Sequence, residues 1–305
     1  MDAIQKSLLE QVADLHKVPE GAYNIRANGV SAARNTTANI DIVTKTDKDG
    51  IDIIIKPGTK NESVHIPVVL SQSGLEETVY NDFFIGEDCD VTIVAGCGIH
   101  NCGVQKAEHS GIHSFHLGKN AQVRYVERHY GEGDGTGENI MNPTTIIDME
   151  EGSYLEMETT QIKGVDSTIR TTKATVGPAA TLIIKEKVMT HGKQLAKSDF
   201  TVDLNGEDCH TNVISRSVAK GESKQIFLAR INGNARCYGH SECDAIIMDH
   251  GVVSAIPEVT ANCLDASLIH EAAIGKIAGE QLTKLMTLGL TEKEAEEQIV
   301  NGFLK

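Results

Sequence analysis

The chain of 305 residues contains no tryptophan, and aromatic residues make up only 4% of it. Proteins that bind single-stranded nucleic acid stack the bases on aromatic side chains, so this composition argues against such a surface. Runs of lysine and arginine are also missing, and the formal net charge is −15. A phosphate-binding surface needs clustered basic residues, and we therefore expect no nucleic-acid partner.

Long apolar runs are missing as well. No segment approaches the roughly 18 continuous apolar residues that a membrane span needs, and the first residues show no secretory signal. We therefore expect a cytoplasmic protein without membrane contact. Thiols stay reduced in that compartment, so the seven cysteines are expected to be buried, catalytic or metal-binding rather than paired in disulfides.

The two ends of the chain have helical patterns. Residues 1 to about 20 predict an amphipathic helix that ends near Pro19 and Gly21, with one apolar face made of Ile4, Leu8, Leu9, Val12 and Leu15. From about residue 275 a helical hairpin is expected. Its first helix carries Leu282, Leu285 and Met286 and ends at Gly289. Its second begins with a capping box of Thr291 and Glu294 and carries a stripe of Ala295, Ile299 and Phe303.

Between these ends, short β-branched segments with alternating apolar and polar residues predict many strands. Examples are residues 51–57, 91–96, 122–129, 144–149, 181–188 and 212–218. Glycine-containing turns recur at Gly86, Gly118, Gly152, Gly177, Gly206 and Gly233, at intervals of 32, 34, 25, 29 and 27 residues. Such intervals suit the rungs of a parallel β-helix, each with two or three strands, although a β-sandwich would give similar strands. We therefore divide the chain into 1–24, 25–272 and 273–305.

One stretch, GCGIHNCGVQKAEHSGIHSFH from Gly96 to His116, is dense in potential metal ligands. It contains Cys97, His100, Cys102, His109, His113 and His116. The two cysteines have four residues between them, which is not the CxxC spacing of zinc ribbons and redox pairs. The last three histidines have helical spacing but lie between predicted strands. The stretch is therefore either a metal site or a histidine-rich turn at the end of two rungs.

The glycine-rich GEGDGTG, residues 131–137, resembles a phosphate loop only superficially. A P-loop requires GxxxxGK[ST], and Pro143 prevents the helix that a dinucleotide site needs. A flexible loop is the favoured interpretation. Because the chain has no Walker motif, any ATP-driven step would come from a partner.

A second dense region extends from Cys237 to Glu271. Its candidates are Cys237, His240, Glu242, Cys243, Asp244, Asp249, His250, Cys263, His270 and Glu271. Thiolates combined with imidazoles or carboxylates suit iron or zinc. The segments lie about one rung apart, so stacking could place Cys243 beside His270. Isolated free cysteines are equally common as small buried residues, and the spacing alone leaves both interpretations open.

The C-terminal run ECDAI…IPEV…HEAAIGKIAGEQLTKLMTLGLTEKEAEEQIVNGF resembles the closing segment of the SufB/SufD family of iron–sulfur cluster assembly proteins. The similarity is close over residues 240 to 304 and looser over the middle of the chain. It implies a right-handed parallel β-helix flanked by helical regions. It further implies a scaffold that holds a transient iron–sulfur cluster, with a SufC-type ABC ATPase docked on the C-terminal helices. Other implied partners are a second copy or a SufB/SufD paralogue, a sulfur donor such as a cysteine desulfurase, and recipient apo-proteins.

The resemblance assigns roles to particular residues. Cys243 matches the essential SufB cysteine ahead of the IP motif, while His270 and Glu271 match the HEA motif. Ile269 stands where SufB often has another acid, so one candidate ligand is missing. A fainter match places Cys97 at the SufB cysteine that accepts sulfur and passes it through the β-helix. Cys102 and the neighbouring histidines have no clear family counterpart; weaker candidates for the assembly site are Cys102, His113, Cys237 and Cys263.

The SufB-type ligands in a chain shorter than bacterial SufB predict a minimal homodimeric scaffold, partnered by the ATPase and not itself an enzyme. A structural SufD-like subunit without a cluster, partnering a separate SufB, is the alternative. A metal-dependent hydrolase, which would require bound zinc and turnover without the ATPase, is a third hypothesis. A nucleophilic hydrolase is disfavoured because the chain has no GxSxG nucleophile elbow.

Overall fold

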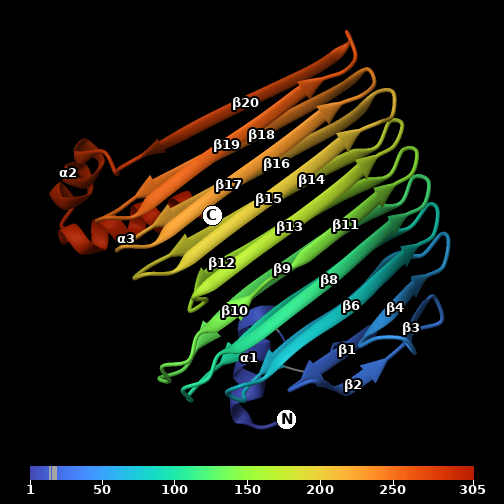
Figure 1. Cartoon of the computed structure of the whole chain (residues 1–305), viewed down its shortest axis with the longest axis horizontal. Helices are drawn as coiled ribbons and strands as arrows, with labels where there is room; N and C mark the ends of the chain where they lie inside the picture. Colours follow the sequence, from blue (N-terminus) through green and yellow to red (C-terminus); the bar gives the residue numbers. More distant parts are fainter. Residues whose placement is uncertain (14, 16–18) are drawn as a thin grey trace.

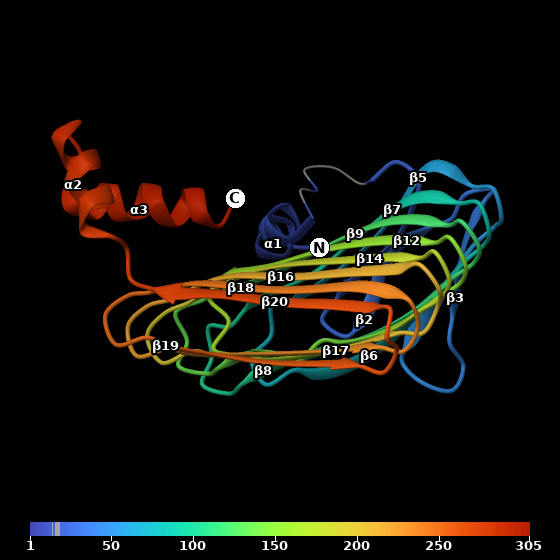
Figure 2. The same ribbon diagram turned by 90° about the horizontal axis from the view of Figure 1, so that it is seen from above.

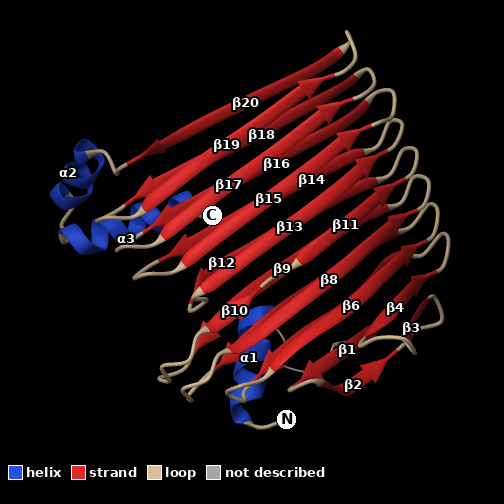
Figure 3. Ribbon diagram, in the orientation of Figure 1, coloured by secondary structure: helices blue, strands red, loops and turns tan. Residues whose placement is uncertain are grey.

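The computed structural model describes residues 1–13, 15 and 19–305, and it consists of long strands stacked side by side (Figure 1) in two sheets that face each other (Figure 2). Figure 3 shows that strands make up most of the molecule and that helices are confined to its two ends. Each rung contributes one strand to each sheet, and nearly all neighbouring strands are parallel. The predicted β-helix is therefore confirmed, and the β-sandwich alternative is wrong. The predicted helix end near Pro19 depends partly on residues 14 and 16–18, which lie outside the described residues.

The first sheet has ten strands. In spatial order they are β2 (Val30–Asn35), β1 (Ala22–Ala27), β5 (Lys60–Leu70), β7 (Asp90–His100), β9 (Gln122–Glu132), β12 (Tyr154–Lys163), β14 (Thr181–Thr190), β16 (Cys209–Ala219), β18 (Cys237–Ile247) and β20 (Ala266–Gly275). The second sheet contains β3 (Ile40–Thr44), β4 (Gly50–Ile55), β6 (Glu76–Ile85), β8 (Ala107–Leu117), β10 (Asn139–Met141), β11 (Thr144–Met149), β13 (Ser167–Val176), β15 (Leu195–Leu204), β17 (Lys224–Gly233) and β19 (Val252–Ala261).

The register between strands gives the length of a rung. Gln122 pairs with Tyr154, an offset of 32 residues, and Leu195 pairs with Lys224, an offset of 29. The glycine intervals therefore predicted the rung correctly. The turns between rungs stack on one another and share a left-handed residue, at Asp88 (φ 54°), Asn120 (φ 54°), Gly152 (φ 69°), Ala179 (φ 52°) and Asp208 (φ 59°). Asn, Asp and Gly tolerate this conformation, whereas Ala is uncommon there.

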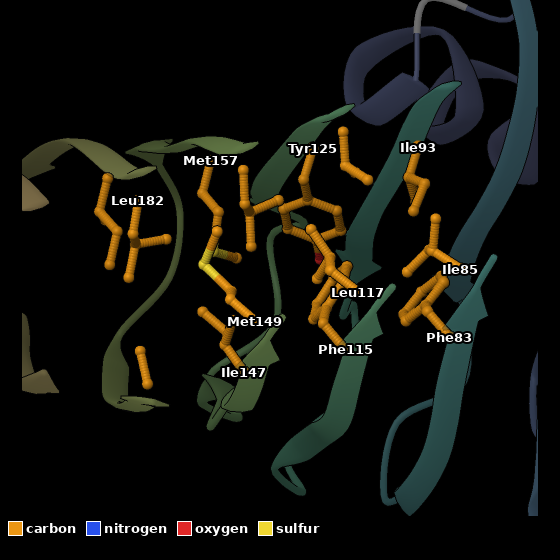
Figure 4. Packing of buried hydrophobic residues seen from close by; sticks show 14 of the residues in the cluster. Phe83, Ile85, Ile93, Phe115, Leu117, Tyr125, Ile147, Met149, Met157 and Leu182 are labelled. Atoms are coloured by element: carbon orange, nitrogen blue, oxygen red, sulfur yellow. The ribbon is translucent and has the colours of Figure 1, made fainter. Parts of the chain in front are cut away.

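The core fills the space between the two sheets. Inward positions alternate with outward ones along most strands, as in the pattern of β14. Phe83 and Phe115, from the neighbouring strands β6 and β8, and Tyr125, from β9 of the opposite sheet, are fully buried and meet in the core (Figure 4). The rings of Phe83 and Phe115 are parallel with centroids 4.5 Å apart. Such stacking of like residues along the axis lets each rung bury its inner face on the next.

Helix α1 (Ala3–Ala13) packs on the outer face of the first sheet (Figure 2). It buries Leu8, Leu9 and Val12, while Ile4 of the predicted apolar face is 41% exposed. The strand below it carries Gly96 and Gly98. A Cβ atom at Gly98 would lie 3.1 Å from Leu8, and one at Gly96 would lie 2.9 Å from the Val12 carbonyl. The two glycines therefore allow α1 to approach β7 closely, directly behind Cys97.

The two ends of the solenoid differ. At the N-terminal end the ladders finish in antiparallel pairs, β1 with β2 and β3 with β4, whose outer strands are only six and five residues long. At the other end, β19 and β20 are ten residues each and form the last members of the two sheets. They carry the exposed apolar side chains Val252, Ile256, Val259, Ile269 and Ile274. Long apolar edge strands are the kind that pair with another chain.

Two helices follow the last rung, as the sequence predicted. Helix α2 (Gly279–Thr287) has no buried residue, and Gly289 ends it with φ 99°. Helix α3 (Glu292–Phe303) begins with the predicted capping box, in which Glu294 N donates to Thr291 Oγ1 and Thr291 N donates to Glu294 Oε2. Its buried residues are Ala295 and Val300. Within the described part of the chain, no helix combines the length and apolar character of a membrane-spanning segment.

Candidate functional site

The last rungs bring Cys243 and His270 to the same face of the first sheet. Cys243 is 1% exposed and points inward from β18. In the β18–β20 ladder His270 pairs with Ser241, and Cys243 pairs with Ala272. Because side chains two residues apart on a strand share a face, Ser241, Cys243 and His270 all line the interior. The sequence suggested that stacking could place Cys243 beside His270; in the structure the two residues share a face of the sheet, and their positions in the register differ by two residues.

Polar atoms at this end of the interior lack partners. The Nδ1 atom of His270 and the hydroxyl of Ser241 are buried and have no hydrogen-bond partner among the described residues. Buried polar atoms are rarely left unsatisfied, so such a pair indicates a place where something else binds. Burial, followed by the neighbouring His240, lowers the pKa of His270. The imidazole is therefore neutral near pH 7 and has a lone pair free to bind a metal ion.

The thiol of Cys243 is held in its protonated form. Burial, the carboxylate of Glu186 and that of Asp244 raise its pKa to about 12. A thiol binds metal as the thiolate, so iron would have to displace a proton from Cys243. A cation arriving at the site supplies the positive charge that stabilises the thiolate.

Glu271 lies on the other face of the sheet. It follows His270 directly and is exposed, and its Oε2 atom is 3.7 Å from Nε2 of His240. His240 in turn contacts Asn212, with Nδ1 at 3.0 Å from Oδ1. Burial and the neighbouring Asp244 raise the pKa of Glu242, which lies beside Glu271 in the register. Within one chain, the Glu271 carboxylate and the Cys243 thiol therefore lie on opposite faces of the sheet, separated by its thickness.

Cys97 points inward from β7 and is 2% exposed. It borders an interior cavity of about 10 Å³, room for about one water molecule, whose polar lining is His109, His113, Glu127 and His129. Burial, with the charges of Glu77 and Glu127, raises the pKa of Cys97 well above its ordinary value. The thiol and its imidazole neighbours therefore form one enclosed polar compartment.

The histidines of this stretch lie on a strand, not in a turn. His109, His113 and His116 all belong to β8, and the first two are buried. His113 contacts the Tyr125 hydroxyl at 2.8 Å, and His109 contacts Glu77 at 2.9 Å. The interpretation as a histidine-rich turn is therefore wrong. Because four residues are an even spacing on a strand, His109 and His113 lie on the same inward face.

A column of polar side chains joins the Cys97 compartment to Cys243. Successive inward positions in the register of the first sheet are Glu127, Thr159, Glu186, Ser215 and Cys243. Cys97 pairs with His129, one inward position further along the strands. Five strand-to-strand steps separate β7 from β18, which at the usual spacing is about 24 Å. The sheet thus carries a continuous polar track between the two cysteines.

The centre of this track is an ionic network that the sequence interpretation missed. Arg170 Nη1 lies 2.8 Å from Glu127 Oε2, and Arg170 Nε lies 3.8 Å from Glu186 Oε1. Glu186 also accepts hydrogen bonds from Ser198 and Ser215. Although it is buried, the pKa of Glu127 is well below its ordinary value, with the Arg170 charge foremost among the groups that lower it. The alternation of QVRYVERH could have found Glu127, because it shares parity with the apolar Val123 and Tyr125.

The remaining candidates lie elsewhere. Cys237 begins β18, six residues from Cys243, and is buried beside Cys209 of the adjacent strand. Cys263 lies in the turn before β20. Cys102 is exposed in the loop after β7. Across the described residues, no three Cys, His, Asp or Glu side chains of one chain are arranged to hold a metal ion.

Comparisons with known proteins agree with this architecture. Residues 77–303 match the family described as SUF system FeS cluster assembly, SufBD core domain. A relative from Methanocaldococcus jannaschii is 29% identical over 83% of this chain and 79% of its own length. One from Archaeoglobus fulgidus is 33% identical over 85% of this chain and 69% of its own, and one from Methanothermobacter thermautotrophicus is 26% identical over 84% and 62%. All three carry the name iron-sulfur cluster assembly SufBD family protein.

Proposed function

The chain belongs to the SufBD family of iron–sulfur cluster assembly proteins, and on this basis we propose that it is a scaffold on which a new cluster is built and then passed to recipient apo-proteins. The cluster is its cargo. Cys243 and His270 bind it at the open end of the solenoid, where the unpartnered Nδ1 of His270 carries the assignment. The soft thiolate and the borderline imidazole suit iron.

Glu271 completes the ligand set from a second protomer. Consecutive residues of a strand face opposite ways, so His270 and Glu271 of one chain do not face Cys243 together. The long apolar edges of β19 and β20 favour pairing with a second copy. In the proposed dimer, the outer face of β20 of one chain lies against the open end of the other, so that its Glu271 reaches the partner's Cys243. The partner in this proposal is therefore the same chain, in place of a SufB/SufD paralogue.

Sulfur reaches Cys243 from Cys97 along the interior track. Cys97 is the start of this track and receives sulfane sulfur that originates from a donor such as a cysteine desulfurase. The column of Glu127, Thr159, Glu186 and Ser215 offers polar contacts in an otherwise apolar core. Arg170 supplies a positive charge halfway along it. A persulfide is anionic near neutral pH, and a buried guanidinium lowers the cost of moving such an anion through a low-dielectric interior.

The ATP-driven step belongs to a SufC-type ABC ATPase docked on the C-terminal helices. Helix α2 buries none of its residues, and Met286 and Leu288 are 44% and 76% exposed. An amphipathic helix with an uncovered apolar stripe is suited to a partner's groove. The chain itself is a binding protein and not an enzyme.

Anaerobic reconstitution of the purified protein with ferrous iron and sulfide tests the scaffold role. The wild-type protein is expected to bind both and to show thiolate-to-iron charge-transfer absorbance, while Cys243→Ala loses most of it. Cys209→Ala is the matched control, because Cys209 is also buried but lies beside Cys237, away from Cys243 in the register. Full cluster content in Cys243→Ala would refute the ligand assignment. If the wild-type protein binds no cluster and is stable only with a longer relative, it is a structural SufD-like subunit instead.

A further inference from the structure

A thiol, an imidazole and a carboxylate line up at the ends of two neighbouring strands: Cys102 lies in the loop after β7, His100 is the last residue of β7, and Glu132 is the last residue of β9. The Sγ atom of Cys102 lies 2.9 Å from His100 Nε2, and His100 Nδ1 lies 3.0 Å from Glu132 Oε1. In this order the imidazole can take the proton of the thiol, and the carboxylate holds the ring in the required orientation and tautomer. Cys102 is exposed, whereas Cys97 and Cys243 are buried.

The loop is held rigidly enough for this arrangement to persist. Asn101 Nδ2 donates to the Gln105 carbonyl, Gly103 N donates to Asn101 Oδ1, and Asn101 N donates to the Glu132 carbonyl. A second loop, GEGDGTG (residues 131–137), lies against it. A Cβ atom at Gly133 would be 2.1 Å from the Asn101 carbonyl oxygen, and one at Gly135 would be 2.3 Å from that of Gly103. The glycines of this motif are therefore needed for close contact between two loops.

This contact brings a second polar group to the thiol. A hydrogen bond from Cys102 lowers the pKa of Asp134, which lies in the glycine-rich loop. Cys102 is therefore placed between the imidazole of His100 and the carboxylate of Asp134. Two polar side chains therefore contact one exposed sulfur atom, one from the end of β7 and one from the glycine-rich loop.

Because Cys97 is buried, sulfur from another protein needs an exposed thiol at which it can first be accepted. Cys97 is 2% exposed, and burial raises its pKa well above the ordinary value. A persulfide carried by another protein cannot reach a sulfur atom that is enclosed by two sheets and covered by α1. Cys102 is only five residues along the chain, at most about 18 Å from Cys97 between Cα atoms.

We propose that Cys102, activated by His100 and positioned through Glu132, is the surface site that accepts sulfane sulfur from an external persulfide; this rests on the proposed function. His100 takes the thiol proton, and the Cys102 thiolate attacks the outer sulfur of R–S–SH. A new Sγ–S bond forms as the S–S bond of the donor breaks. The leaving thiolate takes the proton from His100, giving Cys102–S–SH and R–SH with no net oxidation or reduction.

Glutathione persulfide and a persulfide-loaded cysteine desulfurase are the two probes of the test, each added to the reduced protein. Mass spectrometry then locates the added sulfur on individual cysteine peptides. Cys102 is expected to carry it first with both probes. If only glutathione persulfide reacts, the source is a small molecule; if both react, a protein can supply the sulfur. First appearance of the sulfur on Cys97 or Cys263 overturns the proposal.

Variants separate activation from exposure. His100→Gln is expected to react with glutathione persulfide roughly tenfold more slowly near pH 7, because a free thiol is only a few per cent ionised there. The rate of this variant should rise with pH as that of an ordinary thiol does. Glu132→Gln should shift the pH profile by a smaller amount. His116→Gln changes an exposed histidine of β8 and should leave the rate unchanged. A wild-type rate and pH profile in His100→Gln would overturn the proposal.

Reconstitution distinguishes this proposal from the scaffold role. Inorganic sulfide bypasses persulfide chemistry, so Cys102→Ser should assemble a cluster from iron and sulfide as the wild-type protein does. When each protein is first loaded with glutathione persulfide, freed of the excess and then supplied with iron and dithionite, the same variant should assemble far less cluster than the wild-type protein, because only protein-bound sulfane sulfur is then reduced to sulfide. Failure of the wild-type protein with inorganic sulfide would refute the scaffold role alone, because persulfide transfer to Cys102 is measured separately. Equal assembly by Cys102→Ser and the wild-type protein from the persulfide would refute the role of Cys102 alone.

Discussion

Arg170 and Glu127 form an ion pair of 2.8 Å in the interior of the solenoid, where their side chains are 7% and 4% exposed. They come from opposite sheets, β13 and β9, so the pair crosses the core between the two layers. Charges are rarely buried in protein cores unless they are paired. The pair therefore explains how a polar track can pass through an otherwise apolar β-helix.

Removing one partner of this pair should destabilise the protein strongly. Arg170→Met leaves the Glu127 carboxylate buried without its counter-charge, and a loss of about 3–5 kcal/mol in the free energy of unfolding is expected. Urea denaturation measures it. Arg230→Met is the control, because Arg230 pairs with Asp199 and Glu258 at a partly exposed site and should cost about 1 kcal/mol or less. The double variant Glu127→Gln/Arg170→Met should recover part of the loss; equal losses for the two single variants would contradict this account.

Stability should fall as the pH decreases from 6.5 to about 4. Burial lowers the pKa of His113 from 6.5 to about 4, with Glu127 opposing the shift and His109, His129 and Arg170 adding to it. In that window the unfolded chain binds a proton at this site that the folded protein does not. The free energy of unfolding therefore decreases with falling pH by up to about 1.4 kcal/mol per pH unit from this group.

Urea denaturation across this pH range tests the effect. His113→Gln should show a shallower dependence on pH, whatever its stability at neutral pH. His116→Gln should keep the wild-type slope, because His116 points out of β8 and its side chain is 42% exposed. An unchanged slope in His113→Gln would show that other groups cause the acid sensitivity.

The proposed sharing of ligands between two protomers can be tested with mixed dimers. A dimer of Cys243→Ala with Glu271→Ala retains one complete site if the thiol and the carboxylate come from different chains, and none if they come from the same chain. A dimer of the wild-type chain with the double variant gives the opposite result. Differently tagged chains allow each mixed dimer to be purified, and iron content after reconstitution is the measurement. Retention of iron only in the second dimer would refute ligand sharing.

Close contact between backbone segments predicts sensitivity at Gly131. A Cβ atom there would lie 1.8 Å from the Gly164 carbonyl oxygen. Gly131→Ala must displace one of the two segments and should cost about 1–3 kcal/mol in the free energy of unfolding. Gly302→Ala is the control, because no atom lies within 4 Å of its added Cβ and Gly302 is helical. Thermal or urea unfolding measures the stability of both variants. Equal stabilities would contradict the argument.

The exposed stripe of α2 should bind the ATPase. Met286→Glu introduces a charge on that stripe and should weaken binding of a SufC-type ATPase roughly tenfold or more, the loss expected for a central contact residue. Isothermal titration with the purified ATPase measures the affinity. Gln281→Glu adds the same charge about 140° around the helix axis and should change little. Equal affinities for the two variants would exclude this stripe as the docking surface.

Most of the architecture could be predicted because the pattern of a β-helix repeats. Each rung shows the same alternation and the same turn, so errors at single residues do not change the overall interpretation. The C-terminal helices could be placed to within a few residues because Gly289, Thr291 and Glu294 act locally. The rung length followed from the glycines, since stacked turns leave no space for a side chain at Gly118 or Gly206.

The candidate site was less predictable, because it depends on which way each strand faces. His270 and Glu271 were taken together as ligands, yet adjacent residues of a strand point in opposite directions. The buried charges of Glu127, Arg170 and Glu186 resemble solvent-facing residues of an amphipathic strand, and only parity with apolar neighbours distinguishes them. The contact of Cys102 with His100, two residues before it, depends on the loop conformation, which spacing does not determine.

The difference between the two ends of the solenoid has a consequence for assembly size. A rod with two adhesive ends would add copies at both of them and grow into a filament. Here one end finishes in the short antiparallel strands β2 and β3, which give a neighbouring chain only a short edge to pair with. The other end finishes in the longer edge strands β19 and β20. In the proposed dimer, contact between two open ends would use both of them, so association would stop at a closed pair. The same strands that expose the candidate ligands would then also limit the number of chains that can surround them.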